Sequence, residues 1–178
     1  MRKLFVLIMV LVMAVIGAGC ASIYDWRGKA AKTECIVDKF EHTQTCDLKD
    51  NFLNEEGPGE WRRFSFGIRK FVKKNDVSYL IRLDYSYNDW FFIEEGESLI
   101  LLVDGKRVGF TTLDSPHRSN TTVCYETAFY PITRKQIKSI ANAKEIFVKV
   151  IGDDGYTNVS FSKENIACIK EFYDTYVK

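Results

Sequence analysis

Residues 77–87 read VSYLIRLDYSY, and this stretch decides the class of fold. Large apolar or aromatic side chains stand at every second position, and most positions between them are polar. The first set is Val77, Tyr79, Ile81, Leu83, Tyr85 and Tyr87, and the second is Ser78, Arg82, Asp84 and Ser86. Because successive side chains of a strand point to opposite faces, a period of two predicts a β-strand with one buried face.

The same alternation precedes this stretch, where Phe64, Phe66 and Ile68 are separated by small or basic residues. A turn signal at Asn75–Asp76 joins the two segments as a hairpin. Asp104–Gly105 predicts another hairpin, since a type I′ turn needs positive φ at both central residues. Further strands are expected at residues 33–40, 43–49, 98–103, 106–113, 121–130, 145–151 and 156–161. We therefore expect eight or nine strands in a meander.

Two helices interrupt the strands. Thr133 and Gln136 have the spacing of a capping box, which predicts a helix over residues 134–142. Ser162 can cap a second helix, over residues 163–176, whose apolar side chains form one stripe that must lie against a sheet. A mainly β (α+β) domain with two peripheral helices closes its core as an antiparallel two-layer β-sandwich or as a β-barrel. We expect the sandwich and keep the barrel as the alternative.

The composition limits the kinds of partner that this chain is expected to bind. Its 178 residues hold 25 Lys and Arg against 24 Asp and Glu, a formal charge of +1. This length predicts one globular domain, and this charge balance is too even to make nucleic acid the default partner. The sequence has no glycine-rich phosphate loop, so we expect no nucleotide cofactor.

The N-terminus has a different composition from the rest. Arg2 and Lys3 precede an unbroken apolar run at residues 4–16, which is too short to span a bilayer. The sequence Ile-Gly-Ala-Gly-Cys at residues 16–20 follows. It resembles the lipobox of bacterial lipoprotein precursors, although glycine stands at position 17, where leucine is commonest.

This resemblance implies a signal peptide over residues 1–19, cleaved before Cys20, which would carry fatty acyl chains. Several chains on one cysteine make a stable membrane anchor. Residues 20–32 would then be a tether and residues 33–178 the globular domain. Because Ala21 stands where an Asp would resemble an inner-membrane retention signal, the family pattern implies the outer membrane, with the domain facing the periplasm.

Four cysteines remain besides the expected lipid carrier, namely Cys35, Cys46, Cys124 and Cys168. An even number in an exported chain predicts two disulfides, for which three pairings exist. The hairpin of residues 33–40 and 43–49 would place Cys35 opposite Cys46, which leaves Cys124 with Cys168. Zinc is disfavoured because structural sites present close cysteine pairs, and we expect no metal.

Catalytic signals are scarce. His42 and His117 fall in expected turns, and no serine lies in a nucleophile elbow, so we assign no catalytic residue. Glu126, in a strand rich in Tyr and Thr, is the carboxylate that a glycan or peptide hydrolase of the envelope could use.

Aromatic side chains are concentrated near the end of the quoted stretch. Tyr85, Tyr87, Trp90 and Phe91 fall within seven positions, and Arg62 and Arg63 begin a basic segment interleaved with aromatics. Aromatic residues are enriched where proteins recognise partners. We expect a non-catalytic, lipid-anchored binding or scaffolding domain whose partner is an envelope protein or peptidoglycan. The alternatives are the envelope hydrolase and an inhibitor of a host lysozyme or protease.

Overall fold

The computed structural model describes residues 31–55, 63–113, 117–119, 123–153 and 155–178, and residues 31–178 form one compact unit. The strands are β1 (Lys32–Asp38), β2 (Thr43–Lys49), β3 (Asn54–Glu55), β4 (Arg63–Lys73), β5 (Asp76–Tyr87), β6 (Glu97–Val103), β7 (Lys106–Thr111), β8 (His117–Ser119), β9 (Cys124–Pro131), β10 (Ile146–Gly152) and β11 (Gly155–Ser160). The helical segments are α2 (Arg134–Ala141), α3 (Lys163–Phe172) and a π-helical turn, η2 (Tyr173–Val177).

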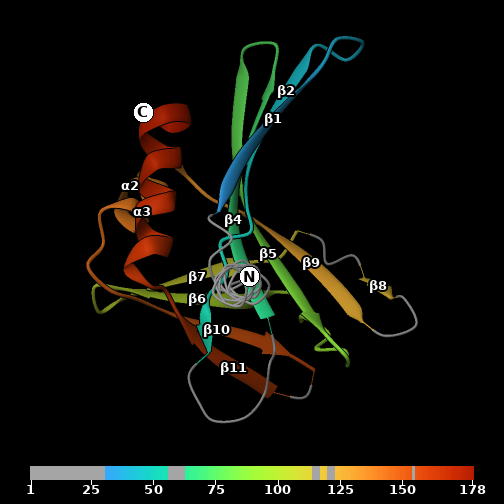
Figure 1. Ribbon diagram of the computed structural model, residues 1–178, viewed down its shortest axis with the longest axis vertical. Helices are drawn as coiled ribbons and strands as arrows, with labels where there is room; N and C mark the ends of the chain where they lie inside the picture. The colour runs from blue at the N-terminus through green and yellow to red at the C-terminus, as the bar shows by residue number, and fades with distance from the viewer. Residues whose placement is uncertain (1–30, 56–62, 114–116, 120–122, 154) are drawn as a thin grey trace, which may run out of the picture. The chain divides into compact units, whose positions relative to one another are not determined.

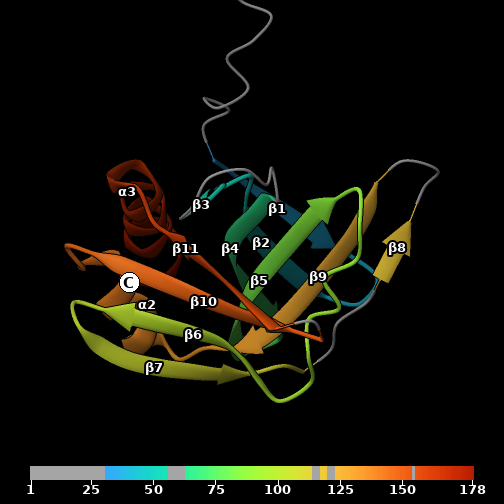
Figure 2. The same cartoon turned by 90° about the horizontal axis from the view of Figure 1, so that it is seen from below.

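The strands form two antiparallel sheets. One has the order β1-β2-β4-β5-β9-β8, and the other has the order β3-β11-β10-β6-β7. Figure 2 shows the strands of the second sheet lying across those of the first. The expected two-layer α+β sandwich is confirmed, in place of the barrel. The simple meander is wrong, because β6 and β7 belong to the second sheet and β9 therefore pairs directly with β5.

The core lies between the sheets and is built from the alternation seen in the sequence. The six-stranded sheet contributes Phe64, Phe66, Ile68, Ile81, Leu83 and Tyr85, and the five-stranded sheet contributes Leu99, Leu101, Val148 and Val150. All of these side chains are buried. At about 1.5–3 kcal/mol for each fully buried large apolar side chain, this layer is the main source of stability.

Local signals place the turns and helices. Asp104 and Gly105 both have positive φ, 46° and 78°, as the predicted hairpin requires. Thr133 and Gln136 form the expected capping box of α2. Ser162 caps α3, and Asn165 completes a second capping box there. Figure 1 shows α2 and α3 side by side on one flank of the sheets.

Two hairpins extend beyond the core (Figure 1). They are the outer parts of β1–β2 and of β4–β5, residues 36–45 and 71–78, and we call them the arm. The two hairpins are hydrogen-bonded to each other through β2 and β4, from Asp47 opposite Arg69 to Thr43 opposite Lys73. The arm is therefore a continuation of the six-stranded sheet past the edge of its partner sheet.

One of the two predicted disulfides is present. Cys35 and Cys46 lie opposite each other and are bonded, with Cα atoms 4.1 Å apart. Cys124 and Cys168 are free thiols, so that predicted pair is wrong. Cys168 lines a cavity with Leu48 of β2, whereas Cys124 begins β9, three strand spacings away, or roughly 14 Å. A disulfide needs Cα atoms within about 7 Å.

Candidate binding site: the aromatic loop after strand β5

The loop at residues 88–93, which we call the aromatic loop, turns alternate side chains inward and outward. Phe91 and Ile93 are buried, whereas Phe92 is 41% exposed and Trp90 is partly exposed. Phe92 has a φ of 51°, a left-handed conformation that is uncommon for a bulky residue. A backbone in this conformation must be held by its surroundings.

Glu126 of β9 holds this backbone. Its Oε1 accepts hydrogen bonds from the N–H groups of Phe91 and Phe92, at 2.6 and 2.8 Å, and its Oε2 accepts one from Ile93, at 2.8 Å. The carboxylate is almost completely buried. Bonds to an ionised acceptor are about twice as strong as neutral ones, so three consecutive donors on one carboxylate fix the loop firmly.

Aromatic packing holds the loop from a second side. The Phe91 ring lies 5.6 Å from that of Phe64, edge to face, and 5.5 Å from that of Tyr85. The Tyr85 hydroxyl donates to the Asp89 carbonyl at 3.1 Å. Buried aromatic pairs of this kind add about 0.5–1.5 kcal/mol beyond their area. The inward half of the loop is thus part of the core.

A third support comes from the other sheet. Ile93 forms a β-bridge with Gly152, and the N–H of Asp153 donates to the Phe92 carbonyl at 3.1 Å. A Cβ at position 152 would lie 2.3 Å from the Phe91 carbonyl oxygen and 2.8 Å from its ring. Glycine is therefore required where β10 approaches the loop.

Trp90 and Phe92 form the outward half of the loop, and we call them the aromatic pair. Their rings are stacked, with centroids 5.6 Å apart and planes inclined by 20°. The N–H of Trp90 donates to Asp89 Oδ1 at 2.8 Å, which closes the start of the loop. The pair presents aromatic surface on a backbone that the body of the domain has already fixed.

The structure sorts the predicted binding residues into different environments. Tyr85 and Phe91 are buried core residues, so their assignment to a surface is wrong. Trp90 is in the aromatic pair, Tyr87 is half-buried and Arg63 is exposed on β4. Arg62, Cys20 and the leader lie outside the described residues. Phe92 is not among the predicted residues, because residues 90–93 are all large and apolar and show no alternation that would separate inward from outward side chains.

Glu126 is unsuited to the catalytic role considered for it. An acid or base must reach a substrate proton, and both oxygens of this buried carboxylate already accept backbone N–H groups. His42 lies in the exposed turn after β1, with a φ of 52°. His117 begins strand β8, so its placement in a turn is wrong, and its side chain lies outside the described residues. The described parts of these three residues assemble no acid–base pair.

The basic segment is largely used within the sheet. Arg69 donates to both oxygens of Asp47, at 2.6 and 2.8 Å, and its guanidinium lies 5.0 Å from the Phe129 ring centroid. The hydrogen bond to Asp47 raises the pKa of Arg69. Lys70 donates to the Tyr176 carbonyl at 2.7 Å. These two cations are therefore bound within the sheet and to the C-terminal helical segment.

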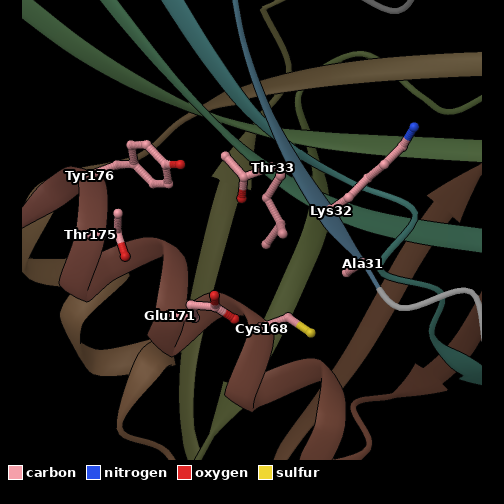
Figure 3. A pocket seen from close by; sticks show the side chains of 8 residues that line it. Ala31, Lys32, Thr33, Cys168, Glu171, Thr175 and Tyr176 are labelled. Carbon is pink, nitrogen blue, oxygen red and sulfur yellow. The ribbon is translucent and has the colours of Figure 1, made fainter.

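A cavity of about 300 Å³ lies between β1 and the C-terminal helical segment. Figure 3 shows Cys168, Glu171, Thr175 and Tyr176 on one side and Ala31–Thr33 on the other. Burial raises the pKa of the Cys168 thiol, and the charge of Glu171 adds to this effect. Because the thiolate is the nucleophile, this thiol is held in its unreactive form.

Comparisons of the chain with protein-family models, with curated proteins and with solved structures find no match. Within the described ranges, no helix has the length and apolar character needed to cross a membrane. The same part of the chain holds no group of three or more His, Cys, Asp or Glu that could bind a metal ion. The aromatic loop is therefore interpreted from its own geometry.

Proposed function

We propose that this protein is a non-catalytic, lipid-anchored binding domain of the bacterial cell envelope, and that Trp90 and Phe92 contact its partner. The observation that carries the proposal is the use of a buried carboxylate, Glu126, to fix a loop that turns two aromatic rings outward.

Physical chemistry favours such a loop as a contact surface. Tyr, Trp and Phe supply large contact areas with few rotatable bonds, so little entropy is lost when they bind. A loop that is already fixed also loses less conformational entropy when it binds. Both arguments favour a contact surface, and the partner proposed for it, an envelope protein or peptidoglycan, follows from the proposed location of the domain.

The anchor in this proposal is Cys20. It rests on the basic start, the short apolar run and the small residues before the cysteine, which resemble a lipobox. Ala21 favours the outer membrane, with the domain on the periplasmic side. Mass spectrometry of the membrane fraction tests this: wild-type protein should carry acyl chains on its first residue, and Cys20→Ser should not. An unchanged lipidated form of Cys20→Ser would contradict the anchor.

Capture from intact envelopes tests the binding surface. Crosslinked partners of the wild type should be lost in the double variant Trp90→Ser/Phe92→Asn, in which Asn suits the positive φ at position 92. Tyr156→Ser, on β11, is the matched control because it removes an exposed aromatic ring elsewhere. Equal capture by all three proteins would contradict the assignment.

The hydrolase alternative is not carried forward, because the carboxylate named for it is occupied by three backbone donors. The inhibitor alternative uses the same kind of surface as the proposed binding domain. It differs only in the partner, which would be a host enzyme added to the purified protein instead of a component captured from the envelope.

A further inference from the structure

The tip of the arm exposes apolar side chains that the core does not use. Phe40, in the turn between β1 and β2, is 96% exposed. Ile36 and Val37 are 65% and 61% exposed, and Val77, at the start of β5, is 48% exposed. Isolated exposed apolar residues are ordinary, but four at one end of the molecule indicate an interaction surface.

These side chains point in different directions. Strand pairing places Val37, Gln44, Val72 and Val77 in one row across the sheet, and Ile36, Thr45, Phe71 and Ser78 in the next row. Neighbouring rows face opposite sides of a sheet. Val37 and Val77 therefore share one face of the arm, Ile36 lies on the other, and Phe40 stands at the end.

Because the exposed apolar side chains lie on both faces and at the end of the arm, they favour contact with a lipid bilayer over contact with one docked protein. A protein that covered one face would leave the apolar residues of the other face in water. The interfacial region of a lipid bilayer encloses a narrow tip from both sides and from its end. The arrangement therefore fits lipid better than a second copy paired along the edge of β1, which would leave Phe40 and Val77 uncovered.

The charged groups at the tip suit this environment. Asp38 Oδ1 accepts hydrogen bonds from the N–H groups of Phe40 and Glu41, at 2.8 and 3.1 Å, and Glu41 pairs with Lys73 at 3.5 Å. Lys39, Lys73 and Lys74 balance Asp38, Glu41 and Asp76 in number. Lysine stems can lie along apolar groups while their ammonium groups reach the headgroups. Contact should therefore depend on apolar burial and little on anionic lipid.

The arm is also rigid enough to present its tip. The Cys35–Cys46 disulfide joins β1 and β2 at the base of the arm, and the β4–β5 ladder runs without a break from Arg63 opposite Ser86 to Lys73 opposite Asp76. The hydrogen bond from Lys70 to the Tyr176 carbonyl ties its base to the C-terminal helical segment. The tip therefore keeps a fixed position relative to the core.

The lengths of the arm and of the preceding segment are compatible with one membrane. From Lys32 to Asp38, β1 rises by about 20 Å at ~3.4 Å per residue, and Phe40 lies in the turn that follows. The chain from Cys20 to Ala31 can extend to roughly 36–40 Å. A lipid on Cys20 and the arm tip can thus reach the same bilayer surface. We propose that the arm tip inserts into the interfacial region of the bilayer to which the chain is anchored, a step that rests on the proposed lipid anchor.

The experiment replaces the lipid anchor, so that its outcome does not depend on Cys20. Residues 21–178 with an N-terminal histidine tag are attached to phosphatidylcholine vesicles that contain a nickel-chelating lipid. This chain should fold, because residues 31–178 form one compact unit with a buried core of their own. Phe40→Trp adds a fluorescent probe at the tip, and Tyr156→Trp adds one at an exposed control position on β11. The signal of the unsubstituted chain is subtracted from each.

Lipids brominated in their acyl chains should quench Phe40→Trp roughly twofold more strongly than Tyr156→Trp, because interfacial side chains lie about 5–10 Å into the headgroup and acyl boundary. The excess should persist when anionic lipid is added and when salt is raised. Equal quenching of the two probes would overturn the proposal, as would quenching that needs anionic lipid. Captured partners lost in Phe40→Ser, together with equal quenching, would instead assign the arm to a protein.

The outcome of the quenching experiment does not depend on the outcome of the Cys20 lipidation test. Excess quenching without lipidation of Cys20 would remove the anchor and keep the membrane contact of the arm. Lipidation with equal quenching would keep the anchor and remove the contact.

Discussion

The two halves of β5 have the same sequence pattern and different environments. From Ile81 to Tyr85 the alternate apolar side chains are completely or almost completely buried, because the five-stranded sheet lies over them. At Val77 the same face of the same strand is half exposed, because the strand has passed the edge of that sheet. Alternation thus shows which side chains share a face, and only the second layer determines whether that face is covered.

The two ends of the molecule are also held by different means. The aromatic loop is fixed by a buried carboxylate and by aromatic packing, and both belong to the core. The arm is held by strand pairing beyond the core and by a disulfide at its base, where Cys46 is buried. Substitutions at the loop should therefore destabilise the whole domain, whereas those at the arm should act locally.

The largest effect is expected at Glu126. Glu126→Ala removes a charged acceptor from three backbone N–H groups, and at about 1–3 kcal/mol for each stranded donor we expect a loss of roughly 4 kcal/mol. Glu126→Gln keeps one acceptor oxygen and should lose about half as much. Urea denaturation measures both. A loss below ~1 kcal/mol in the alanine variant would show that the three hydrogen bonds to Glu126 contribute little to stability.

The comparison within β5 is tested by a matched pair of truncations. Leu83→Ala should lower the free energy of unfolding by about 3 kcal/mol, because it leaves a cavity between the sheets. Val77→Ala, on the same face, should change it by no more than ~0.5 kcal/mol. Similar losses of unfolding free energy in the two variants would mean that the arm is covered in solution. The two halves of β5 would then not differ in burial.

The burial of the Tyr130 hydroxyl in the core is tested by measuring stability at alkaline pH. Burial raises the pKa of Tyr130 from 10.0 to about 12, an effect that its hydrogen bonds to Ser98 and Thr112 partly oppose. The folded state therefore holds this proton more tightly than the unfolded chain does. The free energy of unfolding should be highest below pH 10 and should fall as the pH rises from 10 to about 12. Two pH units correspond to about 2.7 kcal/mol.

Urea denaturation between about pH 9 and about pH 12 measures this loss. Tyr130→Phe is the control, because it has no proton to lose, and its free energy of unfolding should fall by that much less over the same range. Parallel pH profiles for the two proteins would show that the Tyr130 hydroxyl ionises as readily in the folded state as in the unfolded chain.

The smallest global effect is expected from the arm disulfide. The double variant Cys35→Ser/Cys46→Ser should lose about 2 kcal/mol, near the low end for disulfides, because the bond closes a loop of only 11 residues in sequence separation. Amide hydrogen exchange should rise mainly in residues 36–44 and little in β10. An equal rise in β10 would show that the arm and the core unfold as one unit.

Much of the fold was predictable because its signals are local. The period of two in β4 and β5, the Asp104–Gly105 turn and both helix caps depend on residues within a few positions of one another. The Cys35–Cys46 pair followed from the register of one hairpin. The pairing of Cys124 with Cys168 failed because it required knowing which strands separate them.

By itself, the sequence determined most of the secondary structure, though not the short strands β3 and β8, together with the class of fold and the composition that resembles a lipoprotein leader. These features depend on backbone sterics and nearby side chains. Only the tertiary structure decided which aromatics face outward. Phe91 is buried and Phe92 exposed because Glu126, 34 or 35 residues away, binds their N–H groups. Likewise, Val77 and Leu83 differ because a second sheet covers only one of them. Burial is a property of segments brought together by folding, and no local pattern encodes it.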